Sequence, residues 1–202
     1  MPGLFISIQK MNRRKVIKRF CLIVGGGFGV SYTSLKFYQL NKRPDLASLG
    51  QYKILIDALV DTIIPATDSP GAKEAGVGDF VIKMVADCSN KKSQNKFISG
   101  LSDLADYTND HFKKKFNECS LAERTKALAY FEKEAEPYPG LMGKVSHRFL
   151  GDPFFSTLKK YTVLGYCTSE AGATKALAYD YIPGKYIGTI SLAPGQKAWA
   201  TQ

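Results

Sequence analysis

The chain has 202 residues, 45% of them hydrophobic and 23% charged, which fits one ordinary globular domain. Its net charge of +10 is uneven, because residues 1–43 hold nine Lys and Arg and no acid, leaving 19 basic and 18 acidic residues in the rest. A nucleic-acid-binding protein carries its basic surface on the folded domain, so this distribution argues against nucleic acid as a partner.

The N-terminal stretch "RRKVIKRFCLIVGGGFGVSY", residues 13–32, allows two interpretations. Its glycines suggest the G-x-G-x-x-G turn that binds dinucleotides between a strand and a helix. The third glycine position falls on Val30 or Tyr32, depending on the frame, and such large side chains block close packing of the helix on the strand. The spacing therefore argues against a dinucleotide site in this chain.

An export signal fits the same stretch better. The basic region precedes a short, glycine-rich apolar run over 20–32, whereas a helix that spans a bilayer needs about 20 apolar residues. The basic region also resembles twin-arginine signals, which a receptor reads as an address. The residues that carry this resemblance are Arg13, Arg14, Val16, Ile17 and Lys18. No A-x-A cleavage site follows, so cleavage and retention as a membrane anchor both stay open, and Met11 is an alternative start.

Hydrophobic patterning divides the chain into a signal segment over residues 1–34, a linker over 35–48 and a helical domain over 49–202. Within the domain, apolar residues recur with the spacing of amphipathic helices. The predicted helices cover 52–64, 80–88, 93–117, 121–134 and a stretch from 153 onward. Their predicted ends are Pro65 as a stop, Asp79 and Asp152 as N-caps, and Ser120 with Glu123 as a capping box.

The segment beyond Tyr179 has a different pattern. "YDYIPGKYIGTISLAPG" contains two Pro-Gly pairs and several aromatic residues, and it has no helical period. We therefore predict an all-α fold, a single compact helical domain with an irregular proline/aromatic C-terminal arm.

Motifs for catalysis or metal binding are missing from the sequence. It contains no G-x-S-x-G, HExxH or P-loop pattern and no CxxC pair. His111 falls beside the apolar stripe of its helix, which favours a structural role. Glu170 follows Thr168 and Ser169, either of which fits the cap of a new helix. One alternative stays open: a free-standing periplasmic or membrane-attached small enzyme that uses Glu170 or His111 for acid–base chemistry.

Three stretches resemble one family, the gluconate 2-dehydrogenase subunit 3 family. The first is "LIDALVDTIIPATDSPGAKEAGVGDFV" at 55–81. The second is "FFSTLKKYTVLGYCTSEAGATKALAYDYIPGKYIG" at 154–188, in which "GY-TSE-GATKAL-Y" and "PG-Y-G" are the most specific pieces. The third is "ISLAPGQKAWA" at 190–200. The twin-arginine N-terminus also matches this family, so the resemblance covers nearly the whole chain.

The resemblance implies a role without catalysis. Such proteins are small subunits of periplasmic dehydrogenases whose large subunit is a FAD-containing flavoprotein of the glucose–methanol–choline oxidoreductase type, which oxidises a sugar or sugar acid. A third subunit, usually a c-type cytochrome, takes the electrons. The small subunit holds no cofactor or metal. It carries the export signal for the large subunit to the twin-arginine translocation machinery, and it supports the maturation of that subunit.

The matching stretches also supply candidate partner-binding residues. In the first stretch these are Pro65, Asp68, Pro70 and Gly71. In the second stretch and the tail they are Thr168, Ser169, Glu170, Tyr179, Tyr181, Pro183, Gly184, Tyr186 and Trp199. The alternative interpretation is that these residues only fold the chain, as turn prolines, caps and core aromatics. Because tyrosine and tryptophan are enriched at interface cores, we expect Tyr179, Tyr181, Tyr186 and Trp199 to bury against the flavoprotein.

Overall fold

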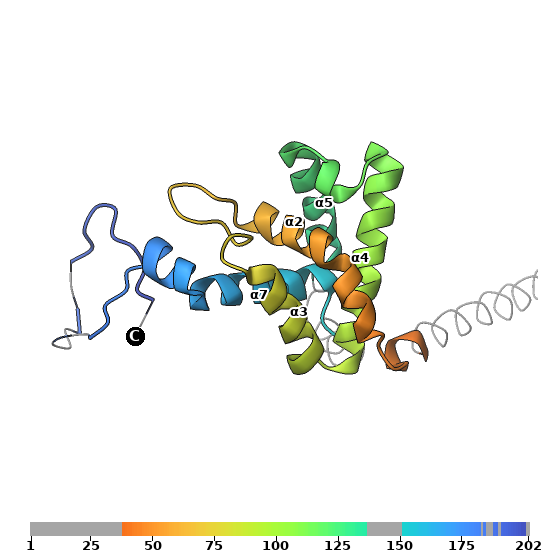
Figure 1. The fold of residues 1–202 in the computed structure, drawn as a ribbon, viewed down its shortest axis with the longest axis horizontal. Helices are drawn as coiled ribbons and strands as arrows, with labels where there is room; N and C mark the ends of the chain where they lie inside the picture. Colours follow the sequence, from red (N-terminus) through yellow and green to blue (C-terminus); the bar gives the residue numbers. More distant parts are fainter. Residues whose placement is uncertain (1–37, 137–150, 183, 185–187, 190, 201–202) are drawn as a thin grey trace, which may run out of the picture. The chain divides into compact units, whose positions relative to one another are not determined.

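The computed structural model describes residues 38–136, 151–182, 184, 188–189 and 191–200. The chain divides into two compact units, and the larger one covers Leu40–Gln202. Its described part consists of helices joined by loops, which confirms the predicted all-α fold (Figure 1). The α-helices are α2 (Lys53–Ile63), α3 (Val77–Cys88), α4 (Lys91–Phe112), α5 (Leu121–Glu134) and α7 (Phe154–Thr168). Shorter turns are the 3₁₀ helices η1 (Leu46–Tyr52) and η2 (Phe116–Glu118) and the π-helix η3 (Gly172–Ala176).

Two predicted helix ends are confirmed. Helix α2 stops at Ile63, two residues before Pro65, whose ring cannot continue a helix. At the start of α5, the Ser120 hydroxyl accepts a hydrogen bond from the Glu123 amide, and the Glu123 carboxylate accepts one of 2.7 Å from the Ser120 amide. This reciprocal pair is the predicted capping box, and it satisfies two amide groups at the helix start.

The predicted ends of α3 at Cys88 and of α5 at Glu134 are also confirmed, whereas several others are wrong by one to five residues. Helix α3 is capped by Gly76 instead of Asp79, because the chain enters it through a left-handed residue with φ of 70°. Helix α4 ends at Phe112, before the predicted 117, because Lys113 turns into the left-handed region with φ of 54°. Helix α7 is capped by Pro153 instead of Asp152.

Helix α7 is the central element of the core, since it packs against α2, α3, α4 and α5 (Figure 1). Two glycines permit this close packing. A Cβ atom on Gly100 of α4 would lie 2.3 Å from the ring of Phe154, and one on Gly165 of α7 would lie 2.5 Å from the ring of Phe80. The largest fully buried side chains around α7 are Phe97, Phe116, Leu49, Ile56, Leu59, Leu101, Leu104 and Leu158.

The residues before η1 contact the helical body. The Asn95 side chain of α4 donates hydrogen bonds to the carbonyls of Leu40, at 3.0 Å, and of Lys42, at 2.8 Å. The described part of the predicted linker over 35–48 is therefore held against α4 from Leu40 onward. Among the described helices, none is long and apolar enough to cross a membrane.

Candidate functional site

The loop between α2 and α3 contains the first group of predicted site residues. The Ala72 amide bonds to the Ile64 carbonyl at 2.9 Å, which closes the loop at its base. Gly71 is buried where the two ends meet, and a Cβ atom there would lie 2.7 Å from the Ala66 amide nitrogen. Gly71 is therefore needed for the fold of the loop, whereas Asp68 is exposed at its outside.

Tyr166 connects this loop to α7. Its hydroxyl donates a hydrogen bond of 2.7 Å to the Pro70 carbonyl and lies 3.4 Å from the Ser69 hydroxyl. The side chain is only 8% exposed, so the bond lies at the edge of the core. It joins the first and second stretches that resemble the family. Sequence reasoning missed this role, because the helical stripe marks Tyr166 as buried without naming a partner for its hydroxyl.

The predicted cap after α7 is present at Ser169. Its hydroxyl accepts a hydrogen bond from the Gly172 amide at 3.0 Å and donates one to the Tyr166 carbonyl at 2.7 Å. Thr168 instead bonds back to the Leu164 carbonyl within α7. Ser169 therefore ends one helix and starts the next turn, a structural role.

The described part of the arm folds back on its own base. Ala178 pairs with Trp199 in an isolated parallel bridge, whose two hydrogen bonds are each 2.8 Å long and join Ala178 to Ala198 and Ala200. The Lys197 ammonium donates a further hydrogen bond to the Lys175 carbonyl at 2.6 Å. The arm is thus a loop with both ends fixed beside η3 (Figure 1).

Predicted interface aromatics of the arm lie at the surface instead of in the core. Tyr181 is 82% exposed, while Tyr179 and Trp199 are each about half exposed. Gly184 is exposed as well. The positions of Pro183 and Tyr186, and of the twin-arginine residues Arg13, Arg14, Val16, Ile17 and Lys18, lie outside the described residues.

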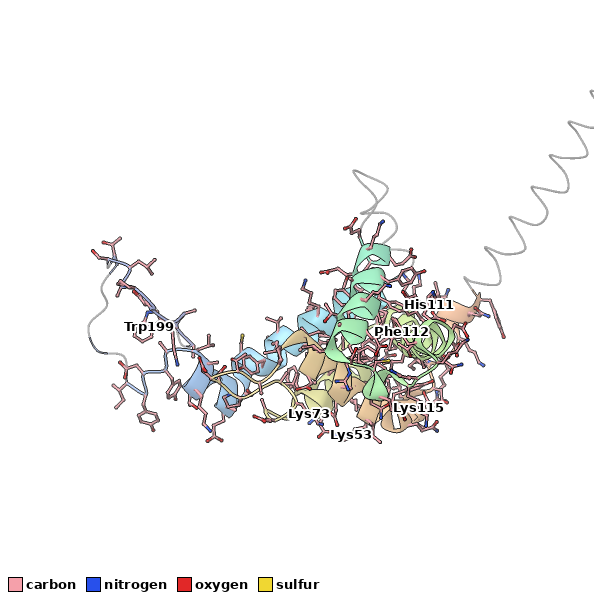
Figure 2. All side chains as sticks on the ribbon, turned by 90° about the horizontal axis from the view of Figure 1, so that it is seen from above. Lys53, Lys73, His111, Phe112, Lys115 and Trp199 are labelled. Carbon is pink, nitrogen blue, oxygen red and sulfur yellow. The ribbon has the colours of Figure 1, made fainter. Side chains whose placement is uncertain are left out.

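The two residues considered for acid–base chemistry lie on different elements. His111, in the last turn of α4, uses Nδ1 in a 3.0 Å hydrogen bond with the Tyr107 carbonyl, and its ring stacks on that of Tyr107 at 4.0 Å between centroids. Glu170 is exposed beyond the end of α7. Figure 2 shows His111 at the opposite end of this unit from Trp199. Within the described residues, no group of three or more His, Cys, Asp and Glu could hold a metal ion.

Within the part of the chain that the structure describes, three groups have shifted pKa values, each for a structural reason. A hydrogen bond to Asp79 raises the pKa of Lys53, whose ammonium also lies 3.6 Å from Asp57, so this lysine links α2 to α3. Burial raises the pKa of the Cys119 thiol, which favours the neutral, unreactive form. Hydrogen bonds from Ser120 lower the pKa of Glu123 in the capping box. The shifts of Lys53 and Glu123 thus come from hydrogen bonds at the starts of helices, and that of Cys119 comes from burial.

A protein-family model matches the chain. The family described as gluconate 2-dehydrogenase subunit 3 matches residues 51–184, a range that includes the loop before α3, helix α7 and the base of the arm. No curated protein and no solved structure matches the chain.

Proposed function

The chain belongs to the gluconate 2-dehydrogenase subunit 3 family, and from this membership we propose that it is the non-catalytic small subunit of a periplasmic sugar or sugar-acid dehydrogenase. Its partner is a FAD-dependent flavoprotein of the glucose–methanol–choline oxidoreductase type. The chain escorts this large subunit through twin-arginine export and supports its maturation. The FAD belongs to the partner, and a c-type cytochrome is the third subunit that accepts the electrons.

The N-terminal sequence is the observation that carries the export role. Arg13 and Arg14 open a twin-arginine motif, and such signals direct export as a receptor-read address. That route accepts proteins that fold before transport, which suits a flavoprotein loaded with its cofactor. The sequence of the small subunit has no dinucleotide-binding motif, so a cofactor of its own does not explain why it would use this route. A folded partner that carries the flavin would account for the use of this route. Export by the route would bring the complex to the periplasmic side of the cytoplasmic membrane.

Two features of the folded unit support the non-catalytic part of the proposal. The ring and Nδ1 of His111 are both engaged with Tyr107, which gives this histidine a role at the end of α4. Ser169 and Tyr166, in the most specific of the family-like stretches, are used for capping and for holding the loop before α3. The histidine that the catalytic alternative would use is thus explained by the fold.

The test replaces both Arg13 and Arg14 with lysine in the full chain. The chain is co-expressed with a candidate large subunit, a flavoprotein of the glucose–methanol–choline type, and the flavoprotein and its flavin absorbance are measured in the periplasm. We expect both to be retained in the cytoplasm, because the receptor requires the arginine pair. The matched control is Arg43→Lys, which lies outside the motif and leaves export unchanged. Normal periplasmic levels of the flavoprotein with the double variant would contradict the escort role.

A further inference from the structure

The outer face of α7 lacks the charges expected of a helix face in water. No charged residue occurs between Lys160 and Glu170. Within this stretch, the buried side carries Tyr161, Thr162, Gly165 and Tyr166, and the outer side carries four uncharged residues at helical spacing. The outer residues are Val163, Leu164, Cys167 and Thr168, all of them exposed. Two turns of α7 therefore present a largely apolar face to the outside.

The arm adds further apolar side chains just beyond this helix face. Tyr181, Ile182 and Leu192 are 74–84% exposed, and Tyr179 and Trp199 are about half exposed. The hydrogen bonds at Ala178 hold the arm in a closed loop before any partner binds. A fixed loop loses less conformational entropy on association than a free tail, so the arrangement favours binding. We name these five residues with Val163 and Leu164 the α7–arm face.

The size of the α7–arm face matches an interface. At roughly 150 Å² for a fully exposed large side chain, its seven partly exposed residues present about 600 Å² in total. The largest apolar patch on an ordinary monomer is about 300–600 Å². A stable complex buries about 800 Å² on each partner. Together these residues therefore expose as much area as the largest patch of an ordinary monomer and supply most of one side of a stable interface.

The charges around the face indicate the class of partner. Lys159, Lys160 and Glu170 flank its helical part in the sequence, and the charged residues from there to the end of the arm are Lys175, Asp180, Lys185 and Lys197. A lipid surface of anionic headgroups favours basic residues alone, whereas this border has both signs. An apolar centre with a mixed charged rim is typical of a protein–protein interface.

We propose that the α7–arm face is the surface through which this chain binds the flavoprotein large subunit. This inference rests on the proposed function, and it extends the sequence prediction by adding the outer face of α7 to the aromatics of the arm. The loop before α3 is hydrogen-bonded to Tyr166 on the buried side of α7, so we expect it to stabilise the fold without contacting the flavoprotein.

The experiment measures the affinity of the full chain for the purified candidate large subunit, a flavoprotein of the glucose–methanol–choline type. One variant combines Val163→Asp with Leu164→Asp, and a second combines Tyr181→Ala with Ile182→Ala. We expect each to weaken binding by roughly 30-fold or more, as at interface hot spots. Matched controls are Ile54→Asp on α2 and Leu121→Asp on α5, which are exposed apolar residues outside the face. The controls should bind as the unaltered chain does, and thermal unfolding should show that every variant is folded.

Three results would overturn the inference. Unchanged affinity of both double variants, while the unaltered chain binds the flavoprotein, would refute the α7–arm face and leave the proposed function standing. Loss of binding in the controls to the same extent would show that the face has no special role. Conversion of a dimer of this chain to monomers by the double variants, without any effect on flavoprotein binding, would assign the face to a second copy. If the unaltered chain does not bind the flavoprotein, the proposed function itself fails.

Discussion

The loop before α3 and the C-terminal arm both belong to stretches that resemble the family, but their surroundings differ. The loop is closed by backbone hydrogen bonds, contains the buried Gly71 and is held by the Tyr166 hydroxyl. The arm is fixed at its base through Ala178 and leaves its large apolar side chains exposed. Proline, glycine and aromatic residues thus stabilise the fold in the loop before α3, whereas in the arm they form part of the exposed surface.

This difference separates two explanations that the sequence leaves open for the same residue types. If the loop serves the fold, substitutions there should lower stability. If the arm serves a partner, substitutions there should leave stability unchanged and weaken association.

The largest loss of stability is expected from Gly71→Ala. The added Cβ atom would lie 2.7 Å from the Ala66 amide nitrogen, a backbone atom that cannot move without opening the loop. Overpacking of this kind costs about 1–3 kcal/mol, which corresponds to a fall of roughly 2–12 °C in Tm for a unit of this size. Thermal unfolding of the full chain measures it. Gly50→Ala is the control, because nothing lies within 4 Å of the added atom; equal Tm values for the two variants would refute the role of Gly71.

A smaller loss is expected from Tyr166→Phe. The substitution keeps the ring in the core and removes the hydroxyl that donates to the Pro70 carbonyl. Loss of one partly buried hydrogen bond costs about 1–2 kcal/mol, because the carbonyl is left without its donor. Chemical denaturation should show this decrease, and Tyr130→Phe on the exposed side of α5 should show no comparable change. A Tyr166→Phe protein as stable as the unaltered chain would mean that the bond does not hold the loop.

The capping box of α5 lies outside both regions and makes a contribution to stability that depends on pH. Hydrogen bonds from Ser120 lower the pKa of Glu123 below its ordinary value of 4.5. A carboxylate with a lowered pKa in the folded state stabilises the fold above the unfolded pKa, and this contribution is lost as the pH falls through the folded pKa. The Tm difference between the unaltered chain and Glu123→Ala should therefore be largest at neutral pH and shrink below about pH 4. A Tm difference that stays the same at every pH would contradict a stabilising role for the charged Glu123 carboxylate.

The smallest change in stability is expected in the arm. Tyr181→Ser and Leu192→Ser replace side chains that are 82% and 84% exposed. Such surface substitutions usually change the free energy of unfolding by less than about 0.5 kcal/mol. Denaturation of each variant measures this, and a loss as large as that of Gly71→Ala would show that the arm, like the loop, serves the fold.

The sequence predicted the fold class and those helix ends that depend on local chemistry. Pro65 and the Ser120–Glu123 pair act within one turn of chain, so their effect can be read from neighbouring residues. The start of α3 at Gly76 and the end of α4 before Lys113 were missed, because left-handed backbone at these positions depends on the path of the whole chain.

The candidate site was predicted only in part, because some of its contacts depend on residues far apart in the sequence. Family resemblance pointed to the arm and the loop, and the aromatic residues of the arm were expected at a surface that a partner covers. The hydrogen bond from Tyr166 to Pro70 joins residues 96 positions apart, which no local pattern can indicate. The apolar outer face of α7, with Val163 and Leu164, could have been noticed from the absence of charges between Lys160 and Glu170.

Hydrogen–deuterium exchange of the full chain, alone and bound to the flavoprotein, tests most directly whether this protein is a subunit that binds through α7 and the arm. We predict that amides over 161–169 and in the described part of 177–200 exchange more slowly in the complex. Those in the loop over 65–71 should be protected equally in both states. Slower exchange elsewhere, with 161–169 and 177–200 unchanged in a formed complex, would contradict the account.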